Sequence, residues 1–363
     1  MIKYSLAVIC FFILNCSFAQ PSMDVLKHYY PNTQEPGGIL SQKKDGVMKM
    51  SSQGMAHLKE NRAITSHTRF RMASVSKQFT AMAIYLLIKD NKISFETPLR
   101  TLFPELSSAY DPVKVKHLIN HSSGLMDYEN LIPNDQKNQL SDGDVLQLIQ
   151  NQDSLYFTPG TQFRYSNTAY CLMSLIVERV SNLGYEVFCY ENIFKRLNMT
   201  SAQISAPQTY ENRAFGYRPK GNEFYFADQS ITSATRGDGG VYIAAEDYLN
   251  WADRNNILFA ADFYTDFEQQ AMLVKDNVYY SMGWFYTKSD EGFLTMFHSG
   301  ESTGFHNIVL FQPEPNRAYT LFTNRDDLRI AKIFDEVLSK ENINLPSLSE
   351  SLFLWLNNVY SGE

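Results

Sequence analysis

The 363-residue chain is poor in cysteine and carries neither a long apolar segment nor a cluster of basic residues. No Cys/His spacing typical of a zinc site occurs, so neither a metal nor another cofactor is expected. The formal net charge is −7, and no run of Lys or Arg stands out. Nucleic acid is therefore not an expected partner. Internal repeats, low-complexity tracts and an interdomain linker are also lacking.

Of the four cysteines, Cys10 and Cys16 lie in the first 19 residues, which leaves Cys171 and Cys189. Both remaining cysteines occur in apolar segments with helical periodicity. In an exported protein they can pair as a disulfide, whereas their apolar surroundings favour two buried thiols. Both alternatives stay open at the level of the sequence.

Residues 1–19 have the pattern of a removable export signal. A basic residue near the start precedes the apolar stretch from Leu6 to Leu14, and Ser17-Phe18-Ala19 is a small-x-small cleavage site. The apolar stretch is too short to span a bilayer. We therefore expect a periplasmic or secreted mature chain without a transmembrane span. The alternative is a lipoprotein anchored through Cys16, for which Asn15 is a poor neighbour.

The pattern of predicted elements is discontinuous along the chain. A short helix is expected within 24–35, a hairpin over 38–58 with its turn at Asp45-Gly46, and a long helix after Ser74. Residues 90–200 are mostly helical, with pronounced helices over 167–181 and 184–196. Strands are expected over 279–287, 292–299, 305–311 and 317–323. Helices over 326–340 and about 347–358 follow.

Strands at both ends with helices between them predict an α/β (α+β) fold, in which an antiparallel sheet is flanked by helices. Residues 20–363 form one domain in this reading. Its sheet lobe would comprise about 24–90 and 275–363, and its mainly helical lobe about 91–274. The cleft between the two lobes would place Ser74 at their junction.

Ser74-Val-Ser76-Lys77 is the segment that points most directly to chemistry. Residues three apart lie on one face of a helix, so the Ser74 hydroxyl and the Lys77 amine are expected side by side. A hydroxyl beside a proton acceptor suits nucleophilic catalysis, and the ordinary alternative is an N-cap serine. The same spacing in Ser41-Gln42-Lys43-Lys44 is interpreted as a solvated strand end.

Two further motifs support this interpretation. A Pro-Gly turn leads into Tyr165-Ser166-Asn167, just before an apolar helix, and the ordinary alternative is a turn with a capping residue. His298-Ser299-Gly300 ends a predicted strand, where glycine lets a ligand backbone approach. Its ordinary alternative is a strand end with a half-buried histidine.

A rival motif, Gly300-Glu301-Ser302-Thr303-Gly304, matches the Gly-x-Ser-x-Gly nucleophile elbow. That elbow joins a strand to a helix, whereas residues 305–311 read as another strand. The only later histidine is His306, which is too close in sequence to serve as the base. The elbow is therefore not favoured.

In their order along the chain, Ser-x-x-Lys, Pro-Gly-x-x-Phe-x-Tyr-Ser-Asn and His-Ser-Gly resemble the motifs of the serine β-lactamase-like hydrolases. This family includes class C β-lactamases, penicillin-binding peptidases, D-aminopeptidases and related esterases. Residues 68–74, 121–125, 237–241 and 281–284 resemble further family segments, and the likeness runs from about 35 to 325. The resemblance implies a β-lactamase/transpeptidase-like fold and a cofactor-free serine hydrolase that forms an acyl-enzyme.

The resemblance also implies roles for individual residues. Ser74 would be the nucleophile, and Lys77 and Tyr165 would transfer protons, with the identity of the general base left open. Asn167 would orient Lys77 and contact the substrate. The backbone N–H groups of Ser74 and Glu301 would form the oxyanion hole. His298, Ser299 and Gly300 would complete the substrate-binding strand.

The chain departs from the family pattern at the third motif, which begins with His298 where β-lactamases and most penicillin-binding enzymes have lysine. That lysine supplies a fixed positive charge for a substrate carboxylate, whereas histidine titrates near neutral pH. We therefore expect a small-molecule or peptide substrate that is neutral or carries an amine, as for an esterase or a D-aminopeptidase. The alternatives are a D,D-peptidase or weak β-lactamase acting on cell-wall peptides or β-lactams, and a catalytically silent binding module.

Overall fold

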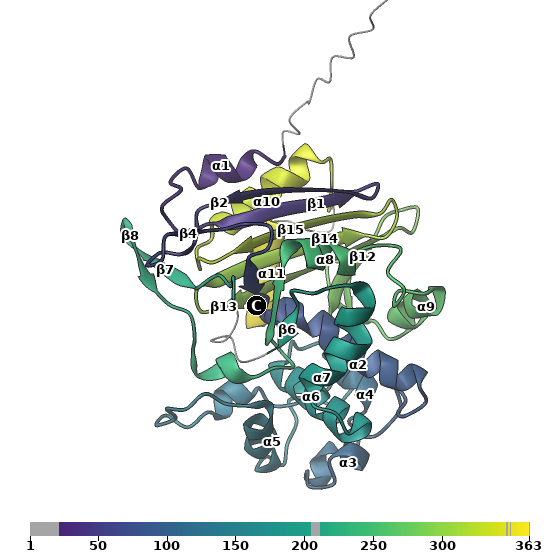
Figure 1. Ribbon diagram of the computed structural model, residues 1–363. Helices are drawn as coiled ribbons and strands as arrows, with labels where there is room; N and C mark the ends of the chain where they lie inside the picture. The colour runs from purple at the N-terminus through teal and green to yellow at the C-terminus, as the bar shows by residue number, and fades with distance from the viewer. Residues whose placement is uncertain (1–21, 205–210, 346–347, 349, 363) are drawn as a thin grey trace, which may run out of the picture.

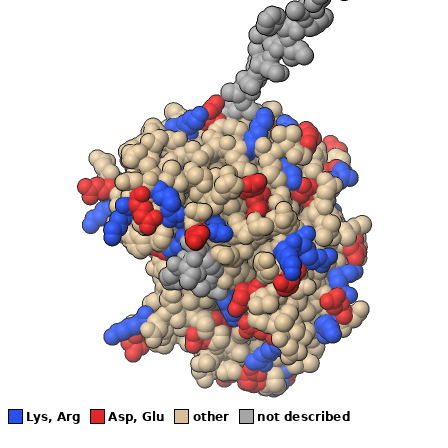
Figure 2. All heavy atoms as spheres, in the orientation of Figure 1, with Lys and Arg blue, Asp and Glu red and all other residues tan. Residues whose placement is uncertain are grey.

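The computed structural model describes residues 22–204, 211–345, 348 and 350–362 (Figure 1). The expected export signal and the alternative anchor at Cys16 lie outside these residues. Of the helices in the described ranges, none has both the length and the apolar character required to cross a bilayer. On the face drawn in Figure 2, acidic and basic side chains are interspersed, so the coloured residues there form no continuous patch of one sign.

An eight-stranded antiparallel sheet forms the framework of the molecule. Its order is β10 (Met272–Lys275), β11 (Val278–Ser281), β12 (Trp284–Lys288), β13 (Leu294–Ser302), β14 (Phe305–Gln312), β15 (Arg317–Thr323), β1 (Gly38–Lys44) and β2 (Val47–Gln53). The N-terminal hairpin β1–β2 joins the sheet through β15, with Gly38 opposite Thr323. The expected fold, an antiparallel sheet drawn from both ends of the chain and flanked by helices, is confirmed.

Within the described residues, three smaller sheets accompany the large one. β5 (Arg69–Arg71), β9 (Val241–Ala244) and β6 (Gln203–Ile204) form the sheet β5-β9-β6. The other two are the pairs β3 (Met55–His57) with β4 (Arg62–Ala63), and β7 (Tyr217–Lys220) with β8 (Glu223–Phe226). The sheet β5-β9-β6 matters for the site because β5 leads directly into the Ser74 segment.

The helices are α1 (Val25–Tyr29), α2 (Lys77–Lys89), α3 (Leu99–Leu102), α4 (Val115–Ile119), α5 (Asp142–Gln150), α6 (Asn167–Ser181), α7 (Tyr185–Cys189), α8 (Ala245–Trp251), α9 (Ala261–Gln269), α10 (Arg329–Lys340) and α11 (Leu352–Ser361). Helices α3–α7 gather below the sheet in Figure 1, and α2 packs against α6. Helix α10 packs against β14 and β15, α11 against β13, and α8 against β1 and β15. The lobe boundaries stay a prediction, and α8, which was assigned to the helical lobe, contacts the sheet.

Several predicted boundaries differ from the structure. The expected strand 279–287 is two strands, because Met282 and Gly283 adopt φ values of 44° and 84° and turn the chain between β11 and β12. The expected strand 292–299 continues to Ser302, so the His-Ser-Gly motif lies inside β13 rather than at its end. The expected helix 184–196 breaks after α7 into a π-helical turn and a 3₁₀ turn.

The interpretation of the second Ser-x-x-Lys copy as solvated is wrong. Ser41 and Lys43 are buried, because β1 is an interior strand between β15 and β2 and α8 packs against it. The Ser41 hydroxyl contacts that of Thr320, and the Lys43 ammonium pairs with the Asp253 carboxylate and donates to the Leu249 carbonyl at 3.3 Å. This copy is therefore part of the core of the sheet.

Cys171 and Cys189 are both buried and free. The disulfide that the sequence left open does not form between them, and the two buried thiols that it favoured are present. Each thiol packs in the helical region, on α6 and α7 respectively.

Replacing the buried lysine of β1 tests whether its ion pair stabilises the fold. In Lys43→Met the Asp253 carboxylate, whose side chain is 14% exposed, loses its cation. We expect the free energy of unfolding to fall by about 3 kcal/mol, as measured by urea denaturation at pH 7. The exposed Lys92→Met is the matched control, with an expected change below about 0.5 kcal/mol. Equal stabilities of the two variants would contradict the assigned role of this ion pair.

Candidate active site

Ser74 lies in a tight turn between β5 and α2. Residues Ala73–Ser76 form a 3₁₀ turn that continues directly into α2, whose first residue is Lys77. Ala73 adopts a left-handed φ of 47°, a conformation that costs free energy for a residue with a Cβ. The turn leaves Ser74 half-buried, and Ser74 lines a cavity of about 240 Å³. The hydroxyl is thus placed at the edge of an open space.

Lys77 connects three segments that are distant in the sequence. Its fully buried ammonium donates to Ser74 Oγ at 3.1 Å, to Asn167 Oδ1 at 2.7 Å and to the Asp238 carbonyl at 2.8 Å. Burial lowers the pKa of Lys77 to about 8, although the nearby negative charge of Asp238 raises it. Lys77 therefore loses its proton far more easily than a lysine in water.

Tyr165 lies beside both residues. Its ring centroid is 4.9 Å from Lys77 Nζ. Its buried hydroxyl has no hydrogen bond of standard geometry to any described residue. Burial raises the pKa of Tyr165 well above its usual value, and the nearby Ser74 hydroxyl lowers it by a smaller amount. The structure therefore brings Ser74, Lys77, Tyr165 and Asn167 together, with the tyrosine as a neutral phenol.

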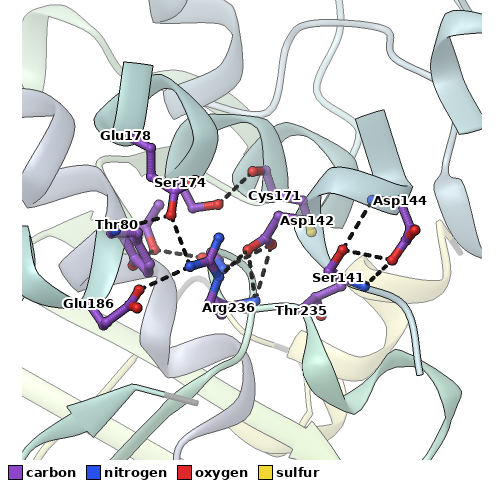
Figure 3. Close-up of polar contacts among 12 residues, drawn as sticks. Thr80, Ser141, Asp142, Asp144, Cys171, Ser174, Glu178, Glu186, Thr235 and Arg236 are labelled. Atoms are coloured by element: carbon purple, nitrogen blue, oxygen red, sulfur yellow. Dashed lines mark hydrogen bonds and ion pairs between the residues drawn. The ribbon is translucent and has the colours of Figure 1, made fainter. Parts of the chain in front are cut away.

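Arg236 fixes the loop whose Asp238 carbonyl accepts from Lys77. Figure 3 shows the Arg236 side chain between acidic residues of three helices. Its Nε lies 2.9 Å from the carboxylate of Asp142, which is fully buried and also accepts from the Arg236 backbone at 3.1 Å. Its remaining carboxylate partners are Glu178 and Glu186, each at 2.9 Å. These bonds hold the loop against α5 and α6.

Asn167 is the first residue of α6, and Ser166 caps this helix by accepting from Ala169 N at 3.2 Å. While Asn167 Oδ1 accepts from Lys77, its Nδ2 donates to Glu129 Oε1 at 2.6 Å. Burial in the cleft raises the pKa of Glu129, and the bond from Asn167 opposes this rise. Sequence reasoning missed Glu129, since no motif marks it.

The third motif packs against the turn that carries the nucleophile. A Cβ on Gly300 would lie 2.1 Å from the Met72 carbonyl oxygen and 3.3 Å from Ser74 N. Glycine at this position therefore lets β13 approach the backbone of the turn itself. The close approach of a ligand, for which the sequence suggested this glycine, stays a prediction.

His298 and Ser299 are both fully buried in β13, so the interpretation of a half-buried histidine at a strand end is wrong. His298 Nδ1 lies 2.5 Å from the Ser299 carbonyl oxygen and 3.2 Å from the Tyr360 hydroxyl. Its Nε2 is buried without a hydrogen-bond partner in the described part of the chain. Burial lowers the pKa of His298 to about 3. His298 is therefore uncharged at neutral pH.

Glu301 lines the same cavity as Ser74. Burial raises the pKa of its carboxyl to about 7, and a hydrogen bond from Asn357 opposes this rise. His306 Nε2 lies 3.8 Å from the Glu301 carboxylate. The oxyanion hole assigned to the backbone N–H groups of Ser74 and Glu301 stays a prediction, and both residues border one cavity.

A second cavity of about 560 Å³ adjoins the first, and the two share Glu129 and Asn167 in their linings. Tyr165 and Tyr360 line this larger cavity. Tyr360 was missed from the sequence, because the predicted last helix ended before it and carried no motif. The rival elbow at 300–304 is excluded, because it joins β13 to the strand β14 rather than to a helix.

Comparison with known proteins agrees with this architecture. Residues 24–333 match the model of the family described as Beta-lactamase. Penicillin-binding protein 4* from Bacillus subtilis (strain 168) is 24% identical over 313 residues, which cover 80% of this chain and 68% of that protein. The chain spans about two thirds of the length of the curated relatives it matches.

Two solved structures are similar along most of the chain. The penicillin-binding protein from Bacillus halodurans has a TM-score of 0.76 and 26% identity, covering 89% of this chain and 99% of that one. The D-amino acid amidase from Ochrobactrum anthropi SV3, complexed with L-phenylalanine amide, has a TM-score of 0.74 and 19% identity, covering 88% and 97%. The second likeness shows a shared fold.

A methyl group at position 300 tests whether the contact between β13 and the turn sets the geometry of Ser74. In Gly300→Ala the new Cβ would overlap the Met72 carbonyl, so we expect a loss of about 1–3 kcal/mol in stability and a loss of Ser74 reactivity. Both effects are measured by thermal unfolding and by labelling with a fluorophosphonate. The control is Gly143→Ala in α5, where a Cβ meets only the Ser141 Oγ at 3.5 Å. Wild-type labelling by Gly300→Ala would contradict the assigned packing role.

Proposed function

We propose that this chain, which belongs to the beta-lactamase family, cleaves an ester or amide bond through an acyl-enzyme on Ser74. The relatives to which it is similar are serine hydrolases. The contact of 3.1 Å between Lys77 Nζ and Ser74 Oγ at an open cavity carries this proposal. A hydroxyl becomes an effective nucleophile when a base within hydrogen-bond distance accepts its proton.

We infer that neutral Lys77 is the general base. With a pKa of about 8, about one Lys77 in ten is neutral at pH 7. A Tyr165 phenolate is disfavoured by contrast, because burial raises its pKa well above the usual value. Tyr165 then serves as a neutral phenol that passes a proton between Lys77, Ser74 and the leaving group.

The reaction proceeds in two steps in this scheme. Ser74 Oγ attacks the carbonyl carbon while its proton moves to Lys77, and the backbone N–H groups of Ser74 and Glu301 stabilise the oxyanion. The leaving group takes the proton as its bond to the carbonyl carbon breaks. Water then attacks the acyl-enzyme, gives up a proton by the same route and releases Ser74 and the acid.

The lack of a positive charge at residue 298 favours neutral or amine-bearing substrates over carboxylates. His298 is uncharged at neutral pH, and Glu129 and Glu301 line the Ser74 cavity. An esterase or D-aminopeptidase-like activity follows, in keeping with the likeness to a D-amino acid amidase. The likeness to a penicillin-binding protein supports a D,D-peptidase as the second candidate. Export through residues 1–19 is part of the proposal and rests on the sequence pattern.

The acyl-enzyme is tested by trapping the nucleophile and by its removal. We expect a fluorophosphonate to label Ser74, and Ser74→Ala to lower turnover by at least about a thousandfold. Ser41→Ala removes the serine of the other Ser-x-x-Lys copy and is the matched control. The substrates are short p-nitrophenyl esters, D-amino-acid anilides and nitrocefin. A label on another serine, or fast nitrocefin turnover without esterase activity, would contradict the proposal.

The dependence of kcat/KM on pH tests the assignment of the base. Because the active form carries neutral Lys77, kcat/KM should rise with pH and level off above a midpoint near 8. A phenolate base would give a midpoint well above 10 instead, since burial raises the pKa of Tyr165. Initial rates with a p-nitrophenyl ester from pH 6 to 10, corrected for spontaneous hydrolysis, distinguish the two.

A further inference from the structure

Helix α11 brings two side chains to the third motif, although its residues lie about 60 positions further along the chain. Asn357 and Tyr360 are three residues apart, so they share one face of the helix. With its amide nitrogen toward β13, Asn357 donates to the Glu301 carboxylate and to the Phe353 carbonyl at 3.2 Å. Tyr360 reaches the neighbouring His298 and Ser299.

The Tyr360 hydroxyl occupies the polar groups of this motif. It lies 2.9 Å from Ser299 Oγ, accepts from Ser299 N at 3.3 Å and lies 3.2 Å from His298 Nδ1. The ring of Tyr360 packs on that of Tyr165, with 4.5 Å between their centroids. Tyr360 thus contacts both Tyr165 and the buried Ser299, and it separates Ser299 from the larger cavity that it lines; this side of the cavity is called the Ser299 end of the cleft.

A substrate carboxylate that approached Ser299 would find the donors of this residue already engaged by Tyr360. Binding a carboxylate in a desolvated place requires hydrogen-bond donors or a cation to replace the lost water. The Ser299 hydroxyl and N–H already face Tyr360. The ammonium of Lys77 already has three acceptors, and the carboxyl groups of Glu129 and Glu301 line the Ser74 cavity without supplying a positive charge.

We propose that Tyr360 is a specificity-determining residue that closes the Ser299 end of the cleft to substrates whose leaving group carries a carboxylate. The proposal rests on the proposed serine hydrolase activity and deepens it by naming the chemical class that is rejected. Tyr360 acts by occupying donors and space, so its removal uncovers the Ser299 hydroxyl. The rejected class comprises esters and amides whose leaving group bears a carboxylate substituent.

The test compares two esters that share their acyl group. These are 3-carboxyphenyl phenylacetate and its methyl ester, whose leaving groups differ in charge and by one methyl group. Tyr360→Phe removes the hydroxyl and keeps the ring, whereas Tyr360→Ala removes both. The control is Tyr279→Phe, which changes a tyrosine of β11 whose side chain is exposed and stacks on Tyr286 with 5.5 Å between the ring centroids.

We expect wild type and Tyr279→Phe to prefer the methyl ester. In Tyr360→Ala the ratio of kcat/KM for the carboxylate to that for the methyl ester should rise at least about tenfold, mainly through a lower KM. Tyr360→Phe should show a smaller rise. If a Tyr360 variant also displaces Tyr165, the hydrolysis of both esters slows by the same factor, and this factor cancels in the ratio of the two kcat/KM values. A ratio that is unchanged or lower in both variants overturns the proposal.

Calorimetric titration with 3-hydroxybenzoate and with 3-hydroxybenzamide measures the binding affinity of the leaving group at the same end of the cleft, without turnover. We expect Tyr360→Ala to bind the carboxylate with higher affinity than wild type, with no matching gain for the amide. Absence of this gain overturns the proposal. Should wild type lack esterase activity and fluorophosphonate labelling, the proposed function fails, while the titration still decides the role of Tyr360.

Discussion

The buried ammonium of Lys77 determines which segments of the chain must meet at the site. A charged amine without water is costly unless oxygen acceptors surround it. Here the acceptors come from the Ser74 turn, from Asn167 at the start of α6 and from the Asp238 carbonyl. The three segments must meet within hydrogen-bond distance of one atom. The same burial that demands these partners lowers the pKa of Lys77 toward neutrality.

Each of these segments is held by contacts outside the site. Arg236 and the buried Asp142 anchor the loop that supplies the Asp238 carbonyl. Gly300 lets β13 contact the backbone of the Ser74 turn. In that turn Ala73 adopts a left-handed φ. The strain of that turn is stored where two rigid elements fix it. The site is thus a junction of the large sheet with α2 and α6, rather than a feature of one loop.

The parts predictable from the sequence were those set by local spacing. Residue alternation located strands of the sheet and helical periodicity located helices, and the spacing of three placed Lys77 beside Ser74. Asn167 was assigned to the site by the family resemblance. The burial of Ser41 and Lys43 was not predictable, because it depends on the pairing of β1 with β15 and on the packing of α8 against these strands. Tyr360 was missed for a related reason, since its contacts with Ser299 arise only from the packing of α11.

The identity of residue 298 connects the choice of substrate with the choice of base. A lysine there would place a positive charge near Tyr165, whose ring centroid is 6.1 Å from that of His298, and a nearby cation favours a phenolate. The same charge would hold a substrate carboxylate. The buried neutral His298 supplies neither effect. Loss of the cation therefore favours Lys77 over Tyr165 as base, and it leaves the Ser299 end of the cleft free to be closed by a neutral hydroxyl from α11.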